Sequence, residues 1–431
     1  MYTLGNCAGP VCVIHDVVVV GEGAGSIREL QDGPLERAYT WDGAVYRLIE
    51  VRRVSPSTAS PSLRQRVTLA RMPLLDALVT RIRARGAITF ADYMDAALYD
   101  PQHGYYSTRA RIGFDGDYLT ATDLGPVFGR LLARAAADFW QALGKPSEWD
   151  LVEAGAGRGT TLRDLLGALH HANGPAARAA KPAIIEVSAH LRELQARTLD
   201  GQDLRWASSP RALAPIQGVV YANEVLDAFP VHVLVRTAEG VKEAHVDEVD
   251  GRLVEVLRGP STQDLRWRMP ETIPIGGRWE VSPAAEGWVA SLGAALASGY
   301  ILFIDYGDEE SGLLGREGAG TVRGFARHRL LEDPFAEPGA HDLTATVNFT
   351  AIRRAAEGAG LRLVGSATQR EVLTALGARE ATVRPSTPIE LLRQSSRRAA
   401  TDALLDPNGF GAFRVVCYAK DAPTTGLKMF L

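Results

Sequence analysis

Long apolar runs, cysteines and lysines are all scarce in this 431-residue chain. The longest hydrophobic run surrounds Val17–Val20 and falls well short of the roughly 18 apolar residues that a membrane-spanning helix needs. The three cysteines, Cys7, Cys12 and Cys417, are odd in number and lack CxxC spacing, so they indicate neither a disulfide framework nor a metal site. We therefore expect a soluble, cytoplasmic protein that has no membrane partner.

Lysine accounts for only five of the 47 basic residues, and the others are arginine. Arginine suits phosphate recognition, but here it is scattered among 51 acidic residues, and the net charge is −4. A nucleic-acid binder needs a clustered basic face. The charge pattern therefore predicts no nucleic-acid partner, and a GC-rich genome explains the arginine content.

The chain changes character near Met72. Residues 1–71 are rich in Gly, Pro and Ser, and their two short β-like runs are followed by a polar connector. We interpret them as an N-terminal extension, either disordered or wrongly included in the gene. We expect residues 72–149 to form a helical and aromatic region that covers the substrate, and residues 150–431 to form the main domain.

From residue 150 onward, strand-like and helical segments alternate. This alternation predicts βαβ units and a doubly wound, parallel α/β sheet. The expected strands are Asp150–Ala154, Ala183–Val187, Arg205–Ala207, Gly218–Ala222, Tyr300–Asp305, Leu361–Gly365 and Phe413–Lys420.

Two insertions interrupt the alternation. The first spans 231–281 and contains a hairpin predicted over Val231–Leu257. The second, 309–349, is longer than an ordinary connecting loop, and loops of this length are usually functional. We expect it to cover the active site.

A glycine-rich turn follows the first strand of the main domain. It contains Glu153, Gly155, Gly157 and Gly159 and runs directly into a helix. Glycine lets a ligand approach the backbone closely, and the helix N-terminus offers free N–H groups. The spacing is GxGxG rather than the GxGxxG of dinucleotide binders, which disfavours a nicotinamide-dependent oxidoreductase. It suits a ligand with a sulfonium and a carboxylate but no phosphate, and so predicts S-adenosylmethionine.

A similar glycine pattern near the N-terminus is not expected to bind a cofactor. The strand-like run Val17–Val20 leads into Gly21, Gly23 and Gly25, but Gln31–Pro34 then prevents a helix. We interpret this segment as a hairpin or turn.

Two further elements of the main domain carry acidic residues at strand ends. Glu186 ends the second strand, where a carboxylate can accept hydrogen bonds from both ribose hydroxyls of a nucleoside. Asn223, Glu224 and Asp227 follow the fourth strand, at the edge where ligands of open α/β sheets bind. Asn223 could instead cap the next helix, and Asp227 could be solvated.

Several separated motifs make the chain, from about Met72 onward, resemble the MidA-type S-adenosylmethionine-dependent methyltransferases. Besides the Glu153 loop and the Asn223-Glu224 turn, they are Phe90-x-x-Tyr93-Met94, Leu98-Tyr99-x-Pro101, Gly104-Tyr105-Tyr106, Gly113-x-x-Gly116-Asp117-Tyr118, Phe128-Gly129, Asp305-Tyr306-Gly307, His328, Pro338-Gly339-x-x-Asp342-Leu-Thr344 and Thr368-Gln369.

This resemblance implies a Rossmann-like, class I methyltransferase sheet of seven strands. Mitochondrial members of the family are arginine methyltransferases that act in respiratory complex I assembly, which implies a protein substrate such as a respiratory-complex subunit. Glu224 and Asp227, with Asn223, would then hold the acceptor guanidinium. Cofactor binding would fall to Glu153, Gly155, Gly157, Gly159, Glu186 and Asn223.

The chain departs from the family pattern in three places. Thr122-Asp123 replaces Pro-Glu, Ala156 replaces the proline of a GPG sequence, and Thr346-Val347-Asn348-Phe349 replaces HVDF. The last change leaves open an alternative function, that of an assembly factor or binding protein whose methyltransferase site has decayed.

Overall fold

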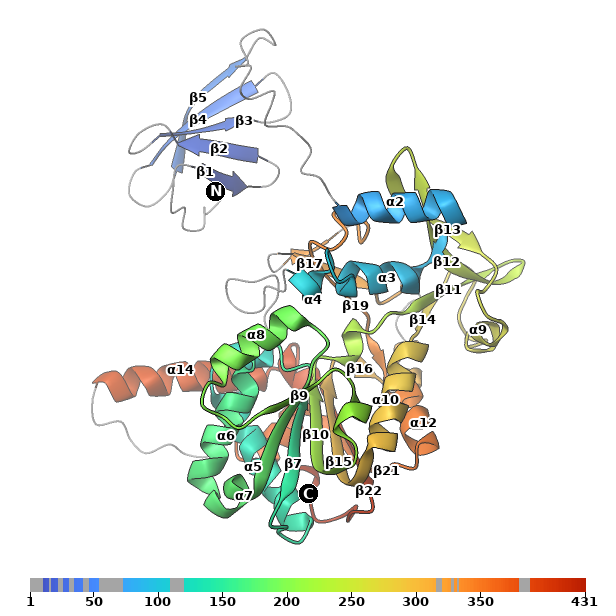
Figure 1. Cartoon of the computed structure of the whole chain (residues 1–431). Helices are drawn as coiled ribbons and strands as arrows, with labels where there is room; N and C mark the ends of the chain where they lie inside the picture. The colour runs from blue at the N-terminus through green and yellow to red at the C-terminus, as the bar shows by residue number, and fades with distance from the viewer. Residues whose placement is uncertain are drawn as a thin grey trace. The chain divides into compact units, whose positions relative to one another are not determined.

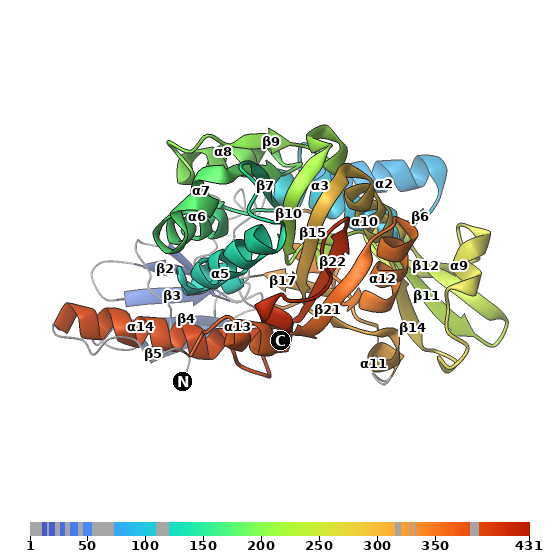
Figure 2. The same cartoon turned by 90° about the horizontal axis from the view of Figure 1, so that it is seen from below.

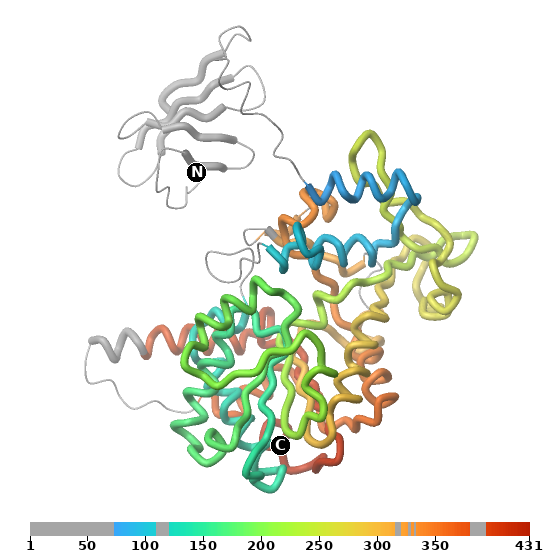
Figure 3. Tube along the Cα trace, in the orientation of Figure 1, coloured from blue at the N-terminus to red at the C-terminus, as the bar shows by residue number. Residues whose placement is uncertain are grey.

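The computed structural model describes residues 11–14, 17–21, 26–30, 35–41, 46–53, 73–108, 120–314, 320–326, 329–331, 333–379 and 388–431. The motif residues between Gly113 and Tyr118, and His328, lie outside this part of the chain. The chain divides into two compact units, Met1–Met72 and Pro73–Leu431 (Figures 1 and 3).

The first unit contains a five-stranded antiparallel meander. Strand β2, which ends at Gly21, pairs antiparallel with β3, in agreement with the hairpin expected there. The assignment of residues 1–71 to an N-terminal extension stays a prediction. The strands are β1 (Val11–Ile14), β2 (Val17–Gly21), β3 (Ser26–Leu30), β4 (Leu35–Trp41) and β5 (Tyr46–Arg53).

The second unit is built on a seven-stranded sheet with the order β21-β22-β15-β10-β7-β8-β9. All seven expected strands are present, with ends shifted by up to four residues. They are β7 (Trp149–Ala154), β8 (Ala180–Ile185), β9 (Arg205–Ala207), β10 (Ile216–Asn223), β15 (Leu296–Asp305), β21 (Arg362–Thr368) and β22 (Arg414–Lys420).

The expectation of a parallel sheet is wrong for β22, which runs antiparallel to both of its neighbours. Two helices, α13 (Gln369–Ala375) and α14 (Pro388–Leu404), separate β22 from β21. Together they return the chain to the carboxyl edge of the sheet, where Arg414 pairs with Asp305 and Thr368. Alternation of strands and helices could not reveal this reversal, because it does not show how many times the chain crosses the sheet.

Helices cover both faces of the sheet (Figure 2). On one face α5 (Val127–Ala142) and α6 (Thr160–Ala172) pack together, and Phe128, Phe139 and Trp149 contribute to the buried core. On the other face α10 (Pro283–Ala295) packs against α12 (Phe349–Gly358). Two short helices, α7 (Gly174–Ala179) and α8 (Ala189–Thr198), complete the crossovers on either side of β8.

The first insertion is larger than the hairpin predicted for it. It contains an antiparallel sheet of four strands, β11 (His232–Thr237), β12 (Gly240–Val249), β13 (Arg252–Arg258) and β14 (Arg278–Val281). A short helix, α9 (Gln263–Trp267), lies between β13 and β14. Strand β12 also pairs with β6 (Ile88–Thr89). The four-residue β14 and two-residue β6 are too short to give a periodic signal, so sequence patterning missed them.

Helices α2 (Pro73–Arg85), α3 (Phe90–Tyr99) and α4 (Tyr105–Thr108) precede the main domain, and Thr89 begins α3 with a capping box to Asp92. They share a buried cluster with the first insertion that includes Tyr93, Met94 and Val246.

The second insertion contains α11 (Glu310–Leu314) and a small sheet of β17 (Arg323–Ala326), β18 (Arg329–Leu330) and β19 (Asp342–Thr344), while β16 (Gly307–Asp308) pairs with β20 (Val347–Asn348).

Gly129 allows the close packing of α5 on α6 and gives a test of the fold. A Cβ at Gly129 would lie 2.7 Å from Asp164 Cβ and 3.0 Å from the Thr161 carbonyl oxygen. We expect Gly129→Ala to lower the free energy of unfolding by about 1–3 kcal/mol, as overpacking does. The matched control is Gly167→Ala on the exposed face of α6, where a Cβ would meet nothing within 4 Å.

The control should be neutral or stabilising by up to about 1 kcal/mol, since alanine favours helix more than glycine does. Denaturant unfolding of both variants makes the measurement. Equal stability of the two variants would contradict this account of the α5–α6 contact.

Candidate active site

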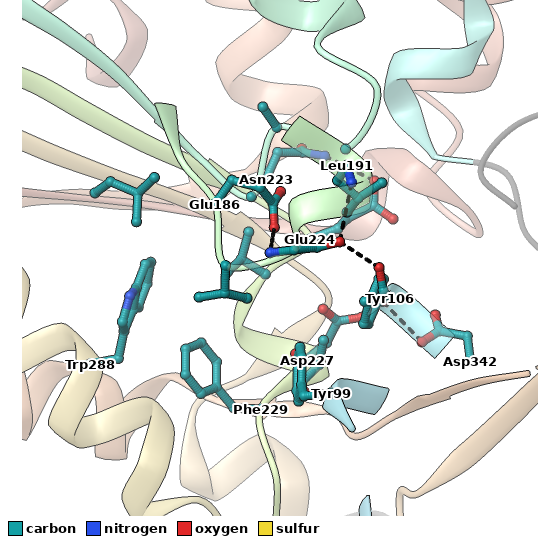
Figure 4. Close-up of a pocket in the computed structure, with 18 of the residues that line it drawn as sticks. Tyr99, Tyr106, Glu186, Leu191, Asn223, Glu224, Asp227, Phe229, Trp288 and Asp342 are labelled. Carbon is teal, nitrogen blue, oxygen red and sulfur yellow. Dashed lines mark hydrogen bonds between the residues drawn. The ribbon is translucent and has the colours of Figure 1, made fainter. Parts of the chain in front are cut away.

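A cavity of about 1110 Å³ opens at the carboxyl ends of the central strands (Figure 4). The sheet edge, helices α3 and α4, and strand β19 all contribute to its lining. Of the residues predicted to form the site, the cavity is lined by Glu153, Gly155, Gly157, Glu186, Asn223, Glu224 and Asp227. Gly159 is not among the lining residues and is instead the N-cap residue of α6.

The glycine loop between β7 and α6 adopts a backbone that favours glycine. The φ angles of Gly155, Gly157 and Gly159 are +64°, +50° and +78°. A Cβ at Gly155 would lie 2.6 Å from Cγ2 of Val225. Glycine at this position therefore lets the loop pack closely against Val225 in the turn that follows β10.

Glu153 lies near the end of β7, just before this loop, and it is almost completely buried. Burial raises the pKa of the Glu153 carboxyl to about 8. Its Oε2 has no hydrogen-bond partner in the part of the chain that the structure describes. A buried polar atom without a partner is costly, and a bound polar ligand would satisfy it.

Gln195, a residue that motif reasoning missed, joins the glycine loop to the acid after β8. Its Nε2 donates to the Gly157 carbonyl oxygen and to Oε2 of Glu186, each at 3.0 Å. The other oxygen of Glu186 accepts from the Ser188 N–H at 2.9 Å. Gln195 is fully buried although it lies on α8, and that unusual burial was not visible from sequence.

The turn after β10 places Asn223 and Glu224 in the cavity. Asn223 Nδ2 and the Ala121 N–H donate to Oε1 of Glu224, at 3.0 and 3.3 Å. Glu224 has a φ of +53°, and burial raises the pKa of its carboxyl to about 8. The Asn223 side chain makes no capping hydrogen bond to the helical turn over Leu226–Ala228, so the helix-cap alternative is not observed.

Asp227 is buried rather than solvated, which excludes the second alternative. Burial raises the pKa of its carboxyl to about 6. Oδ1 of Asp227 and the hydroxyls of Tyr306 and Thr344 make no hydrogen bond within the described residues. All three residues line the cavity.

Asp305, the last residue of β15, holds the backbone of this turn by accepting hydrogen bonds from its N–H groups. Its Oδ2 accepts from the N–H groups of Val225, Leu226 and Asp227 at 3.1, 2.9 and 3.3 Å, and its Oδ1 accepts from the Tyr306 N–H at 2.8 Å. The side chain is only 1% exposed. Asp305 was noted only as part of a motif, because its hydrogen bonds to a turn about 80 residues away have no local sequence signal.

Two tyrosines from the N-terminal helices form a further wall, which sequence reasoning did not assign to the site. Tyr99 and Tyr106 stack with ring centroids 5.6 Å apart. Tyr99 donates to the Ala228 carbonyl oxygen at 2.9 Å, and Tyr106 donates to Oδ1 of Asp342 at the same distance (Figure 4). The two tyrosines thus connect the turn after β10 to β19 of the second insertion.

The residues at the family's Pro-Glu position also contact the site. Asp123 lies in a short helical turn, Ala121–Leu124, and its carboxylate forms an ion pair with Arg158 of the glycine loop. The other oxygen of Asp123 accepts from the Thr120 N–H and hydroxyl, both at 2.9 Å. Aspartate is one methylene shorter than the glutamate of the family pattern, but Asp123 still forms an ion pair with the glycine loop through a buried carboxylate.

The cavity is strongly acidic. Among the described residues that line it, the only cation is Arg158, which is paired with Asp123. Within those same described ranges no cluster of His, Cys, Asp and Glu could hold a metal ion. The carboxylates that line the cavity are Asp95, Glu153, Glu186, Glu224, Asp227 and Asp342.

Residues 131–367 match the model of a family described as putative S-adenosyl-L-methionine-dependent methyltransferases. The chain belongs to this family. A protein from Burkholderia thailandensis, crystallised with S-adenosyl-homocysteine, is 31% identical and superposes with a TM-score of 0.74 over 83% of this chain and 94% of that one. The protein is therefore an S-adenosylmethionine-dependent methyltransferase with a class I fold, as the sequence predicted.

Curated relatives are named mitochondrial protein arginine methyltransferase NDUFAF7. The human protein is 32% identical over 66% of this chain and 69% of its own length, and the Xenopus tropicalis protein is 30% identical over 70% and 75%. These names contradict the cytoplasmic location expected from the cysteine content. That expectation was wrong because cysteine usage reports the redox environment and does not identify a compartment.

The altered positions Thr346 and Asn348 do not line the cavity. Asn348 caps α12 through the Ala351 N–H, and the Thr346 N–H donates to Oγ1 of Thr321. Both residues have structural contacts of their own, so their departure from the family pattern leaves the cavity intact. None of the described helices is both long and apolar enough to cross a membrane.

Cofactor binding can be tested with S-adenosyl-homocysteine. At a concentration 100 times its Kd, the ligand should stabilise the protein by about 2.7 kcal/mol and raise the melting temperature. Gly155→Val should abolish this increase while the protein stays folded by circular dichroism, since a side chain at this position would collide with Val225 and displace the loop. A wild-type protein with no shift at millimolar ligand would contradict the assignment of the cavity.

Proposed function

We propose that the enzyme methylates an arginine side chain of a protein. The acidic cavity is the observation that carries this proposal, because a guanidinium entering it would meet several carboxylates and no free described cation. The relatives named as protein arginine methyltransferases support the same substrate class. The family resemblance suggests a respiratory-complex subunit as the acceptor.

The residues around the glycine loop fit S-adenosylmethionine. Gly155 and Gly157 would accommodate its amino-acid part, because both line the cavity and helix α6 begins beside them. Gly159, which does not line the cavity, would contribute through its positive φ at the start of that helix. Glu186, held by Gln195 and the Ser188 N–H, would accept the ribose hydroxyls. Glu153 and Asn223 each have a buried oxygen without a partner in the described chain, and these would receive polar groups of the cofactor.

When bound, S-adenosylmethionine supplies a methyl group on a sulfonium. The chain's own residues then have to orient the acceptor and exclude water. Glu224 and Asp227 would hold the planar guanidinium by paired hydrogen bonds and leave one nitrogen facing the methyl group. Deprotonation beforehand is not required, because the nitrogen loses its proton after it gains the methyl.

Asp227 would receive that proton. Its Oδ1 is free of hydrogen bonds within the described residues, and its pKa of about 6 allows it to be ionised at neutral pH. Tyr99 and Tyr106 would shield the acceptor from solvent, since they connect the turn to the second insertion.

Transfer of radiolabelled methyl groups tests the acceptor. Wild-type enzyme should label proteins in a lysate of cells that lack the enzyme, and acid hydrolysis should release the label as methylarginine. Glu224→Gln should lower the labelling rate by about 10²–10³-fold, as loss of a transition-state contact does. Its melting-temperature shift with S-adenosyl-homocysteine should remain.

The control is Glu148→Gln, which breaks an exposed ion pair with Lys181 and should not change the rate. Label recovered on another residue would contradict the arginine assignment. Normal cofactor binding without any transfer would favour the alternative of a binding protein with a decayed site.

The carboxylates can also be tested without knowing the acceptor. Sinefungin is an S-adenosylmethionine analogue that carries an ammonium group where the methylated sulfonium would be. Raised pKa values leave Asp227 and Glu224 protonated at low pH, so the preference for sinefungin over S-adenosyl-homocysteine should increase as the pH rises through about 6–8. Calorimetric Kd ratios from pH 5 to 8.5 make the measurement.

The variant Glu224→Gln/Asp227→Asn should have a Kd ratio that does not depend on pH. A ratio that does not vary with pH in the wild type would mean that these carboxylates do not face the transferred group.

A further inference from the structure

One short segment contacts both the proposed acceptor site and the cofactor loop. The turn Ala121–Leu124 begins with a capping box in which the carboxylate of Asp123 accepts from the Thr120 N–H. Its Ala121 N–H donates to Oε1 of Glu224, while Asp123 pairs with Arg158. No other described segment has a side chain ion-paired to the glycine loop and a backbone N–H on Glu224.

The geometry of Asp123 differs from that of a surface ion pair. Its side chain has no exposed area, whereas the Arg158 side chain is 42% exposed. A buried carboxylate requires its partners, because removal of one leaves a desolvated charge behind. Asp123 uses one oxygen for Arg158 and the other for its own turn, so the loop and the turn are held by a single carboxylate.

We propose that Asp123 is a positioning residue that couples the cofactor loop to Glu224. A bound cofactor stabilises the loop in which Arg158 lies, Arg158 fixes Asp123, and the capped turn then presents its Ala121 N–H to Glu224. Glu224 is therefore held in position for the acceptor only when the cofactor loop is ordered. This coupling rests on the proposed function for its Glu224 end, but its cofactor end does not depend on the acceptor.

Calorimetry with S-adenosyl-homocysteine tests the cofactor end. Asp123→Asn and Arg158→Gln should each raise the Kd by about tenfold, which is 1.4 kcal/mol. The double variant should bind no more weakly than the weaker single variant, since both changes break the same pair. Arg158→Gln changes a partly exposed side chain and should fold even if Asp123→Asn does not.

The matched control is Asp150→Asn. Asp150 also pairs with an arginine, Arg205, and also accepts a backbone N–H, that of Gln217. It lies near the amino end of β7, at the opposite end of that strand from the glycine loop. This variant should keep the wild-type Kd for S-adenosyl-homocysteine.

The Kd ratio of sinefungin to S-adenosyl-homocysteine tests the Glu224 end. In Asp123→Asn and Arg158→Gln at pH 8.5 this ratio should move toward that of Glu224→Gln, because Glu224 loses its Ala121 contact. A Kd for S-adenosyl-homocysteine within twofold of wild type in both variants, or additive losses in the double variant, would overturn the proposal.

A weakened S-adenosyl-homocysteine affinity with an unchanged ratio would overturn the coupling to Glu224. Both outcomes are independent of whether the acceptor is arginine, which only the methyl-transfer measurement addresses.

Discussion

The four hydrogen bonds that Asp305 accepts are the constraint on which the site depends. They hold the N–H groups of Val225, Leu226, Asp227 and Tyr306, so the end of β15 determines the path of the chain after β10. Glu224 can keep its positive φ because the residues on its C-terminal side are fixed. The second insertion joins the same turn, as the Ala345 N–H donates to the Asp227 carbonyl oxygen at 2.9 Å.

The site combines buried carboxylates that are satisfied with others that are not. Asp305 has both oxygens hydrogen-bonded by backbone N–H groups, and it gives the site its shape. Glu153 and Asp227 each retain a buried oxygen without a partner among the described residues. Buried polar groups in a protein core are hydrogen-bonded, whereas those in a binding site can lack a partner until a ligand binds. These groups mark where ligands would act.

Patterning predicted the seven strands of the main sheet and the glycine loop because each has a strong local signal. Strand runs are apolar, and Gly155, Gly157 and Gly159 need positive φ angles that the sequence reveals directly. The direction of β22, the short strand β14 and the burial of Gln195 have no local signal, since each depends on contacts between segments distant in the chain. Asp123 was noticed only as a departure, and its pairing with Arg158 required the fold.

The position of β22 in the sheet constrains when the sheet can form during synthesis of the chain. This strand lies between β15 and β21, yet it begins at Arg414, long after β15 ends at Asp305. Until residues 414–420 leave the ribosome, β15 and β21 cannot be joined and each has an open edge. The sheet must therefore close after nearly all of this chain has been synthesised, and loss of that one strand would expose apolar edges prone to association.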